Sequence, residues 1–388
     1  MKRFAVMAAA MAALIALPAA AKPMIDCPLR DAPFSVNMPL IDILLSPAAT
    51  AAVESVQPGL LSNIPKFFAS TTPPTFAAIL SMREAAGFAA RFAQNPGKAA
   101  TPDLDRLNAV LAPLPVTQSD KIARCARYDS AAPRLVVPAG HPRVLLFEKI
   151  NGFKDTPSVD AAHAAITAMA QRNGWALVTT ANGGAFSPEI LRGFDTVIWN
   201  NISGDVLTLS QRRAFQRWME NGGGFVGIHG SAGDPVYFWD WYVDTLLGAR
   251  FAGHPMNPQF QTATVRLADA SHPAALGLPA SWEMNEEWYS FKNNPRDTGS
   301  RIIATLDEST YSPVAAPGQN LRMGADHPIV WSRCIGRGGS GGHKAGRMFY
   351  SAIGHRPERY ADAVYVKMLE QAVSWTAGQT GGDCQPAK

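Results

Sequence analysis

The order of apolar and polar positions divides the chain into two parts. From about residue 142 onward, short apolar runs alternate with longer stretches in which apolar residues recur every three or four positions. Short runs of this kind predict buried strands, and the periodic stretches predict helices. Before about residue 128 the helical period dominates, without strand-like alternation. The pattern predicts a small all-α module followed by an α/β domain.

In the N-terminal part, the first predicted helix starts at a proline, a residue suited to the first turn. In the second, Ala85, Phe88 and Phe92 are spaced by three and four, which places them on one face. The predicted helices are Pro47–Val56, Leu80–Phe92 and Asp103–Leu114.

In the second part, strands and helices alternate, which predicts a parallel sheet with helices on both faces. The first predicted strands are Val144–Phe147, Ala176–Thr180, Thr196–Trp199 and Phe225–Ile228, and the helices between them are Ser158–Asn173, Ser187–Arg192 and Ser210–Glu220. Further strands are predicted at Gln261–Leu267, Arg301–Leu306, Ile329–Ser332 and Arg347–Ala352, before a closing helix, Asp362–Thr376.

The N-terminus has the pattern of a secretory signal peptide. Lys2 and Arg3 precede an uncharged, alanine-rich run, and small residues follow up to Ala21. We expect a signal peptide over 1–21, the helical module over 22–127, a linker over 128–141, the α/β domain over 142–378 and a tail over 379–388. The mature protein would be periplasmic or secreted and free of the membrane; a retained membrane anchor is the alternative.

Composition narrows the choice of partners. The formal charge of +4 becomes about +2 when Lys2 and Arg3 are removed, too small to indicate nucleic-acid binding. Export would allow the four cysteines to pair. We expect pairing within each part of the chain, Cys27 with Cys125 and Cys334 with Cys384, among three possible connectivities.

Histidines at predicted strand ends are the first candidates for chemistry. His229 follows the glycine-flanked strand Phe225–Ile228, and His355 follows the run that ends at Gly354. His254 and His327 each precede a proline in a turn. Since ligands bind at the carboxyl edge of such sheets, these imidazoles could meet there as metal ligands or proton carriers. A hydrogen-bonded turn histidine is the plain alternative for each.

Two polar segments add candidates. Glu286 and Glu287 stand between aromatic residues, so one carboxylate can enter a site while the other faces away. Apolar surroundings would raise a carboxyl pKa toward acid/base use. Residues that could bind a polyhydroxylated ligand are Asn200, Asn201, Asp205, Trp288, Tyr289 and His327.

Residues of about 142–378 resemble the ThuA-like (trehalose utilisation) family, a branch of the class I glutamine-amidotransferase-like fold. The segments that carry the resemblance include Asn151-Gly-Phe153, Trp199-Asn-Asn-Ile-Ser-Gly-Asp-Val206, Gly222-Gly-Gly-Phe-Val-Gly-Ile-His229, Glu286-Glu-Trp-Tyr289, His327-Pro-Ile-Val-Trp331 and Gly346-Arg-Met-Phe-Tyr-Ser-Ala-Ile-Gly-His355. The resemblance implies a flavodoxin/amidotransferase-like sheet, a role in disaccharide or keto-sugar catabolism, and histidine ligands at this edge.

The resemblance also carries two differences. His229 occupies the turn where amidotransferases have a nucleophilic cysteine, so amidotransferase activity is not expected. The family often has Phe-Arg-His after the first strand, whereas this chain has Phe153-Lys-Asp155. Asp155 would have to replace that histidine in catalysis. The N-terminal part weakly resembles a helical module attached to some secreted glycoside hydrolases and esterases.

The sequence thus favours an exported enzyme acting on a small-molecule carbohydrate. Catalysis would fall to His229, Glu286, Glu287 and Asp155, and His229, His254 and His355 would hold zinc or manganese; metal-free acid/base chemistry is the alternative. A non-catalytic carbohydrate-binding or scaffold protein is the competing hypothesis. Under either hypothesis the protein could form a homo-oligomer. A hydrolase using Ser231 is disfavoured because the turn lacks the Gly-x-Ser-x-Gly pattern.

Overall fold

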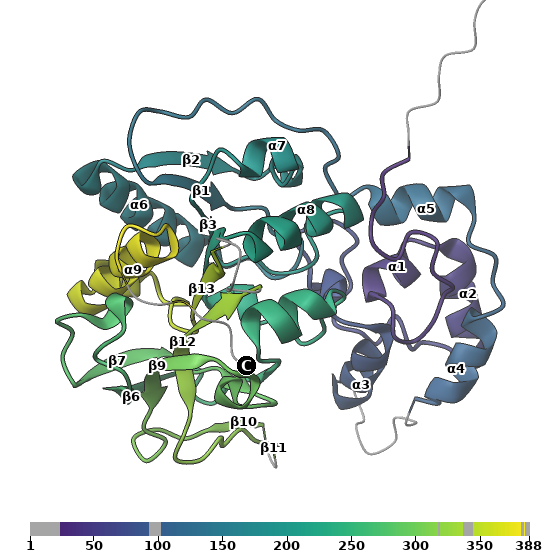
Figure 1. The fold of residues 1–388 in the computed structure, drawn as a ribbon. Coiled ribbons are helices and arrows are strands. Elements are labelled where there is room, and N and C mark those ends of the chain that lie inside the picture. The colour runs from purple at the N-terminus through teal and green to yellow at the C-terminus, as the bar shows by residue number, and fades with distance from the viewer. Residues whose placement is uncertain (1–23, 93–101, 317–318, 337–343, 382–383, 385–388) are drawn as a thin grey trace, which may run out of the picture.

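The computed structural model describes residues 24–92, 102–316, 319–336, 344–381 and 384. The chain forms a helical N-terminal module beside a larger α/β domain, as Figure 1 shows. The predicted signal peptide, residues 1–21, lies outside the described residues. Within the part of the chain that is described, none of the helices combines the length and apolar character needed to span a bilayer.

The helical module has its own hydrophobic core, formed by residues from Phe34 to Leu111. The predicted helix at Pro47 is confirmed, and the Ser46 side chain accepts a hydrogen bond from the Ala49 N–H at its start. The module contains α1 (Leu40–Leu44), α2 (Pro47–Val56), α3 (Met82–Phe92), α4 (Leu104–Leu111), α5 (Gln118–Cys125) and the 3-10 helices η1 (Lys66–Phe68) and η2 (Phe76–Ala78). The pattern missed α1 and α5, which are short.

Five parallel strands form one half of the central sheet, as the sequence predicts. They lie in the order β2-β1-β3-β4-β13, and their apolar runs are buried because helices cover both faces. These strands are β1 (Arg143–Phe147), β2 (Ala176–Thr180), β3 (Thr196–Trp199), β4 (Gly224–Ile228) and β13 (Gly346–Ser351).

The other half of the sheet is antiparallel. Beyond β13 the order continues β12-β9-β6-β7, and each of these pairs is antiparallel. The sheet is therefore mixed, with its parallel half confirming the predicted fold class. The antiparallel strands are β12 (Pro328–Ile335), β9 (Arg301–Leu306), β6 (Phe260–Leu267) and β7 (Ser281–Glu287).

The helices of the domain cover the parallel half. Helices α6 (Thr156–Asn173) and α9 (Ala363–Thr376) lie side by side on one face, and α7 (Pro188–Leu191) and α8 (Leu209–Glu220) lie together on the other (Figure 1). Smaller elements are η3 (Gly183–Ala185), η4 (His229–Ala232), the π-helix η5 (Trp241–Leu247), β5 (Phe251–Gly253), η6 (Pro273–Ala275), β8 (Ser290–Phe291), η7 (Pro295–Thr298), β10 (Val314–Ala316), β11 (Gln319–Asn320) and η8 (Pro357–Ala361).

Both predicted disulfides are confirmed. Cys27 pairs with Cys125 and closes the helical module, while Cys334 pairs with Cys384 and ties the C-terminal tail to β12. Each bond crosslinks residues of the same part of the chain, as expected. Because all four cysteines are in disulfides, the protein has no thiol available as a nucleophile.

Candidate functional site

The register of two parallel strands places His229 next to the segment that carries His355. In the β4–β13 pair, Ile228 lies opposite Ser351, so the residues after each strand leave the sheet together. His229 has a positive φ of 37°, which is uncommon for a residue with a side chain. Such a conformation persists only where the surroundings hold it, and it is found often at functional turns.

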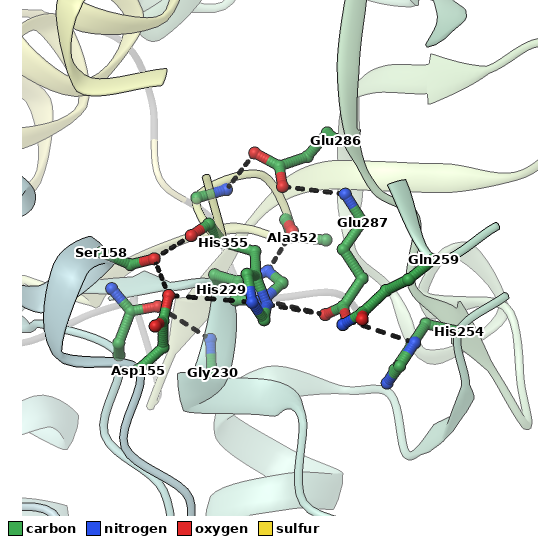
Figure 2. A network of polar contacts seen from close by, with 12 residues as sticks. Asp155, Ser158, His229, Gly230, His254, Gln259, Glu286, Glu287, Ala352 and His355 are labelled. Atoms are coloured by element: carbon green, nitrogen blue, oxygen red, sulfur yellow. Dashed lines mark hydrogen bonds and ion pairs between the residues drawn. The ribbon is translucent and has the colours of Figure 1, made fainter. Parts of the chain in front are cut away.

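His229, His355 and Glu287 meet at this edge of the sheet (Figure 2). His229 Nε2 lies 3.2 Å from His355 Nδ1 and 3.2 Å from Glu287 Oε2, and His355 Nδ1 lies 3.0 Å from the same oxygen. The Nδ1–H of His229 donates to the carbonyl of Ala352 at 2.7 Å. That bond fixes the tautomer and leaves the Nε2 lone pair facing the other two side chains.

The pKa values of these groups move in opposite directions. Burial lowers the pKa of His229, which favours the neutral imidazole. Burial disfavours the charged form of Glu287, but its contacts with the His229 and His355 imidazoles hold the pKa of this carboxyl well below its usual range. Burial also opposes the charge of His355, but the hydrogen bond to Glu287 raises its pKa above the ordinary value. The cluster is thus arranged around one buried carboxylate.

Glu286 supports the cluster from the opposite side of β7. Its side chain is fully buried, and its carboxylate accepts hydrogen bonds from the backbone N–H groups of Glu287 (2.8 Å), Gly354 (3.3 Å) and Arg356 (3.2 Å). The last two flank His355, so Glu286 fixes the loop that presents this imidazole. Burial raises the pKa of Glu286 to about 7. The two neighbouring carboxylates do point apart, but neither faces solvent.

Asp155 approaches the cluster from the start of α6. One of its carboxylate oxygens lies 3.7 Å from His355 Nε2, and the Ser158 hydroxyl contacts both Asp155 and the carbonyl of His355 (Figure 2). The side chain of Asp155 is a quarter exposed. Asp155 therefore lies where the resemblance places a histidine, and it contacts His355 from the solvent side.

His254 and Gln259 complete the surroundings of Glu287. His254 Nδ1 lies 3.2 Å from Glu287 Oε1 and donates to the Pro255 carbonyl at 2.9 Å. Gln259 Nε2 donates to the same carboxylate oxygen at 2.5 Å. Gln259 was not singled out from the sequence, because an amide in a loop gives no spacing signal.

The candidate metal ligands differ in one member from the predicted set. His229, Glu287 and His355 each offer a ligand atom, and these atoms lie within 4.8 Å of one another. His254 instead contacts the far oxygen of Glu287, because that carboxylate stands between His254 and the other two imidazoles. The structure thus brings all three predicted histidines to Glu287, with the carboxylate replacing His254 in the compact group.

Asn200 and Asn201 lie behind the cluster rather than facing a ligand. The Asn200 amide donates to Glu148 (2.8 Å) and to the Val159 carbonyl (2.9 Å), and its oxygen accepts from Asn201 (3.0 Å). The Asn201 oxygen accepts from the Gly230 N–H at 3.3 Å. Both side chains are buried, so they brace the turn after β4 and present no polar atom to a substrate.

Trp288 and His327 are also interior residues. Trp288 donates from Nε1 to the Gln261 carbonyl at 2.8 Å. His327 is fully buried, with Nδ1 2.9 Å from Glu308 and Nε2 donating to the Tyr289 carbonyl at 2.8 Å. Neither side chain reaches the cluster, so a ligand-binding role for them does not agree with the geometry.

Of the remaining candidates, Tyr289 reaches the cluster. Its ring centroid lies 4.2 Å from that of His229 and 6.1 Å from that of His254. Asp205 pairs with Arg212 at 2.6 Å and lines a separate pocket on the other side of the turn. Ser231 is buried and donates to the Trp199 carbonyl at 3.0 Å, so its hydroxyl has a structural partner.

Comparisons with known proteins find similar solved structures. A protein described as ThuA-like from Bacteroides uniformis ATCC 8492 is 25% identical, with a TM-score of 0.51 over 63% of this chain and 95% of its own. A second one, from Parabacteroides merdae ATCC 43184, is 17% identical, with a TM-score of 0.41 over 63% of this chain and 91% of its own. A comparison with curated proteins finds no match.

The sequence also matches a family model. The model is that of ThuA, described as trehalose utilisation, and it matches residues 143–376. This region contains every strand of the central sheet and every side chain of the histidine–glutamate cluster. Because the match spans more than half of the chain, the protein belongs to the ThuA family.

Proposed function

We propose that this protein is an exported enzyme that processes a disaccharide or keto-sugar by acid/base chemistry with the help of a bound zinc or manganese ion. The observation that carries the proposal is the convergence of His229 Nε2, His355 Nδ1 and Glu287 Oε2, with separations of 3.0–3.2 Å. The membership of the ThuA family, described as trehalose utilisation, supports a sugar as substrate. Two disulfides support an oxidising compartment such as the periplasm.

The donor set fits a divalent cation of this kind. Two imidazoles and one carboxylate are ligands that zinc and manganese accept, with positions left for substrate or water. The bond from His229 Nδ1 to the Ala352 carbonyl is the type of outer contact that orients a metal-bound histidine. The lowered pKa of His229 keeps that ring neutral, and the lowered pKa of Glu287 keeps its carboxylate charged. Both residues are thus in the form that binds metal.

His254 is the residue best placed to move a proton. Its side chain is a quarter exposed, against 4% for His229 and 13% for His355. Because Nδ1 donates to the Pro255 carbonyl, the lone pair is on Nε2 and can accept a proton. The adjacent Glu287 carboxylate, 3.2 Å from Nδ1, would stabilise the imidazolium that forms.

The reaction that these residues could support begins next to a carbonyl group of the sugar. His254 would accept the proton from the carbon beside the carbonyl, and the electron pair of that C–H bond would move onto the carbonyl oxygen as an enolate. A bound divalent cation would supply Lewis-acid stabilisation of that negative charge. The electron pair then either expels the glycosidic oxygen from the neighbouring carbon or takes a proton at a new position. Asp155, on the solvent side of His355, could protonate the leaving oxygen.

Metal content and turnover, measured together, test the proposal. The purified mature protein should contain about one zinc or manganese ion per chain by elemental analysis. His229→Ala, His355→Ala and Glu287→Gln should each lower that content to background and abolish turnover on a panel of plain and oxidised disaccharides. His163→Ala is the matched control, because His163 is 44% exposed on α6 and remote from the cluster.

The outcomes separate the proposal from the competing hypothesis. Metal retained by all three variants would contradict the assignment of the ligands. A protein that binds a saccharide but holds no metal and turns over no member of the panel would be a carbohydrate-binding protein instead. His254→Gln should keep the metal and lose turnover; loss of both would contradict the role given to His254.

A further inference from the structure

A row of phenylalanine rings joins the helical module to the histidine–glutamate cluster. The ring of Phe153 stacks on His355 with centroids 6.3 Å apart, and Phe76 packs against Phe153 at 5.1 Å. Phe67 continues the row at 4.7 Å from Phe76. Phe67 and Phe76 belong to η1 and η2 of the module, whereas Phe153 belongs to the loop after β1.

The ends of this row are exposed although they are large and apolar. The exposed fraction is 64% for Phe67 and 37% for Phe153. The buried core of the module, as far as the described residues show it, includes Phe68 at its margin but not Phe67. Phe67 packs on Phe68 and Phe76 of the module, yet most of its side chain remains exposed. Clustered exposed apolar side chains of this kind mark binding surfaces more often than scattered ones do.

The module is hydrogen-bonded to, and closely packed against, the loop that carries Phe153. The Thr75 N–H donates to the Asn151 carbonyl at 3.0 Å, just before η2. Gly152 is packed so closely that an added Cβ would lie 2.5 Å from a side-chain atom of Ile79. The module thus places its aromatic residues at a fixed position relative to His355.

A second exposed ring also contacts His355. Phe260, at the start of β6, contacts His355 with centroids 5.2 Å apart and is 36% exposed. The guanidinium of Arg356 lies 5.5 Å from the Phe260 ring. His355 therefore contacts two partly exposed rings, and the row through Phe153 continues from it in steps of 4.7–6.3 Å.

We infer that the helical module supplies the distal part of the substrate site, with Phe67, Phe76 and Phe153 binding the second ring of a disaccharide whose first ring lies at the cluster. This inference rests on the proposed function, since it takes the cluster as the reacting centre. The apolar face of a pyranose packs on aromatic rings, and its hydroxyls remain at the edge in water. The row continues directly from His355, so a substrate longer than one ring would reach it. A monosaccharide would contact the cluster without contacting Phe67.

The test is a comparison of two-ring and one-ring ligands. Calorimetric Kd values are measured for trehalose, 3-keto-trehalose and glucose on full-length protein with His254→Gln as the background, because this variant should keep the metal and consume no ligand. For whichever disaccharide the background protein binds, Phe67→Ala and Phe153→Leu should each raise the Kd about threefold to tenfold. The Kd of glucose should not change. Ile122→Ala is the matched control, because Ile122 is 60% exposed on α5 of the same module and lies outside the row.

Several results would overturn the inference. An unchanged disaccharide Kd in Phe67→Ala would do so, and so would equal losses for glucose and disaccharide. Failure of the background protein to bind either disaccharide would also overturn it. If any of these results is obtained but the wild-type protein contains metal that His229→Ala loses, the inference about the module fails and the proposed metal centre stands. If Phe67→Ala weakens binding of a phenyl glucoside but not of the disaccharides, the aromatic row binds an aryl group and not a second sugar ring, and the inference is wrong.

Discussion

Glu286 offers the sharpest test of how the site is built. Replacing it by alanine removes the acceptor for three backbone N–H groups, the buried ones of Glu287 and Gly354 and the partly buried one of Arg356. Glu286→Gln keeps one oxygen of the same shape and turns the other into an amide that cannot accept a hydrogen bond. The two variants therefore remove different numbers of hydrogen bonds from the same loop.

The size of the effect follows from the cost of unpaired donors. A buried donor that loses its acceptor costs about 1–3 kcal/mol, and part of this is recovered when the loop relaxes. We expect the free energy of unfolding to fall by about 3–5 kcal/mol in Glu286→Ala and by about 1–2 kcal/mol in Glu286→Gln. Because Gly354 and Arg356 flank His355, the alanine variant should also bind metal about tenfold to a hundredfold more weakly.

Urea unfolding followed by tryptophan fluorescence, with metal titration of the folded variants, gives both quantities. Glu283→Ala is the control, because Glu283 is an exposed residue of the same strand, β7. It should change the free energy of unfolding by less than about 0.5 kcal/mol. If Glu286→Ala is as stable as Glu283→Ala and binds metal as tightly as the wild-type protein, the structural role assigned to Glu286 is wrong.

Three further predictions concern other parts of the structure. His272→Asn should reduce the loss of stability that the protein undergoes between about pH 6.5 and 4. Burial lowers the pKa of His272 in the folded protein to about 4, so in this pH range the unfolded chain binds a proton that the folded chain does not. The wild-type protein therefore loses up to about 3 kcal/mol that the variant keeps. Equal falls in Tm with pH for variant and wild type would contradict this. Arg127→Met leaves Asp42 buried without its 2.6 Å partner and should destabilise the module by about 3–5 kcal/mol in urea unfolding; a change below 1 kcal/mol would refute the estimate. Gly354→Ala should abolish metal binding, because φ is +138° and the new Cβ would lie 2.6 Å from the Tyr360 hydroxyl; metal content equal to that of the wild type would show that the loop adapts.

The sequence predicted the parallel half of the sheet well because each strand there is a short, mostly buried run rich in apolar residues. The runs at Ala176–Thr180 and Thr196–Trp199 are reproduced residue for residue by β2 and β3. Three strands of the antiparallel half, β6, β9 and β12, were found as well, but β7 was missed and the direction of these strands was not predicted. Strand direction depends on which neighbour a strand pairs with, and that partner is not encoded in the local pattern.

The candidate site was predicted in part for the same kind of reason. Residues that directly follow parallel strands meet at one sheet edge, so His229 and His355 could be placed together from the sequence. Glu287 followed from its place beside Glu286, but only the structure shows that it lies between His254 and the other imidazoles.

The failures have a common physical cause. His327 and Trp288 have the composition of site residues, yet their polar atoms are paired inside the protein, and burial of a particular side chain is not readable from residue type. The aromatic row was missed because it joins residues of two separate parts of the chain, Phe76 and Phe153. Contacts of that kind depend on how the parts dock, about which periodicity gives no information.

X-ray absorption at the metal edge of the purified, metal-loaded protein identifies the atoms that bind the metal. We predict two imidazole nitrogens and at least one carboxylate oxygen around zinc, with Zn–N distances of about 2.0–2.1 Å. The variants His229→Ala and His355→Ala are loaded at high metal concentration. The spectrum of each should show one imidazole ligand fewer than that of the wild-type protein. A spectrum without imidazole scattering, or one unchanged in both variants, would contradict the account.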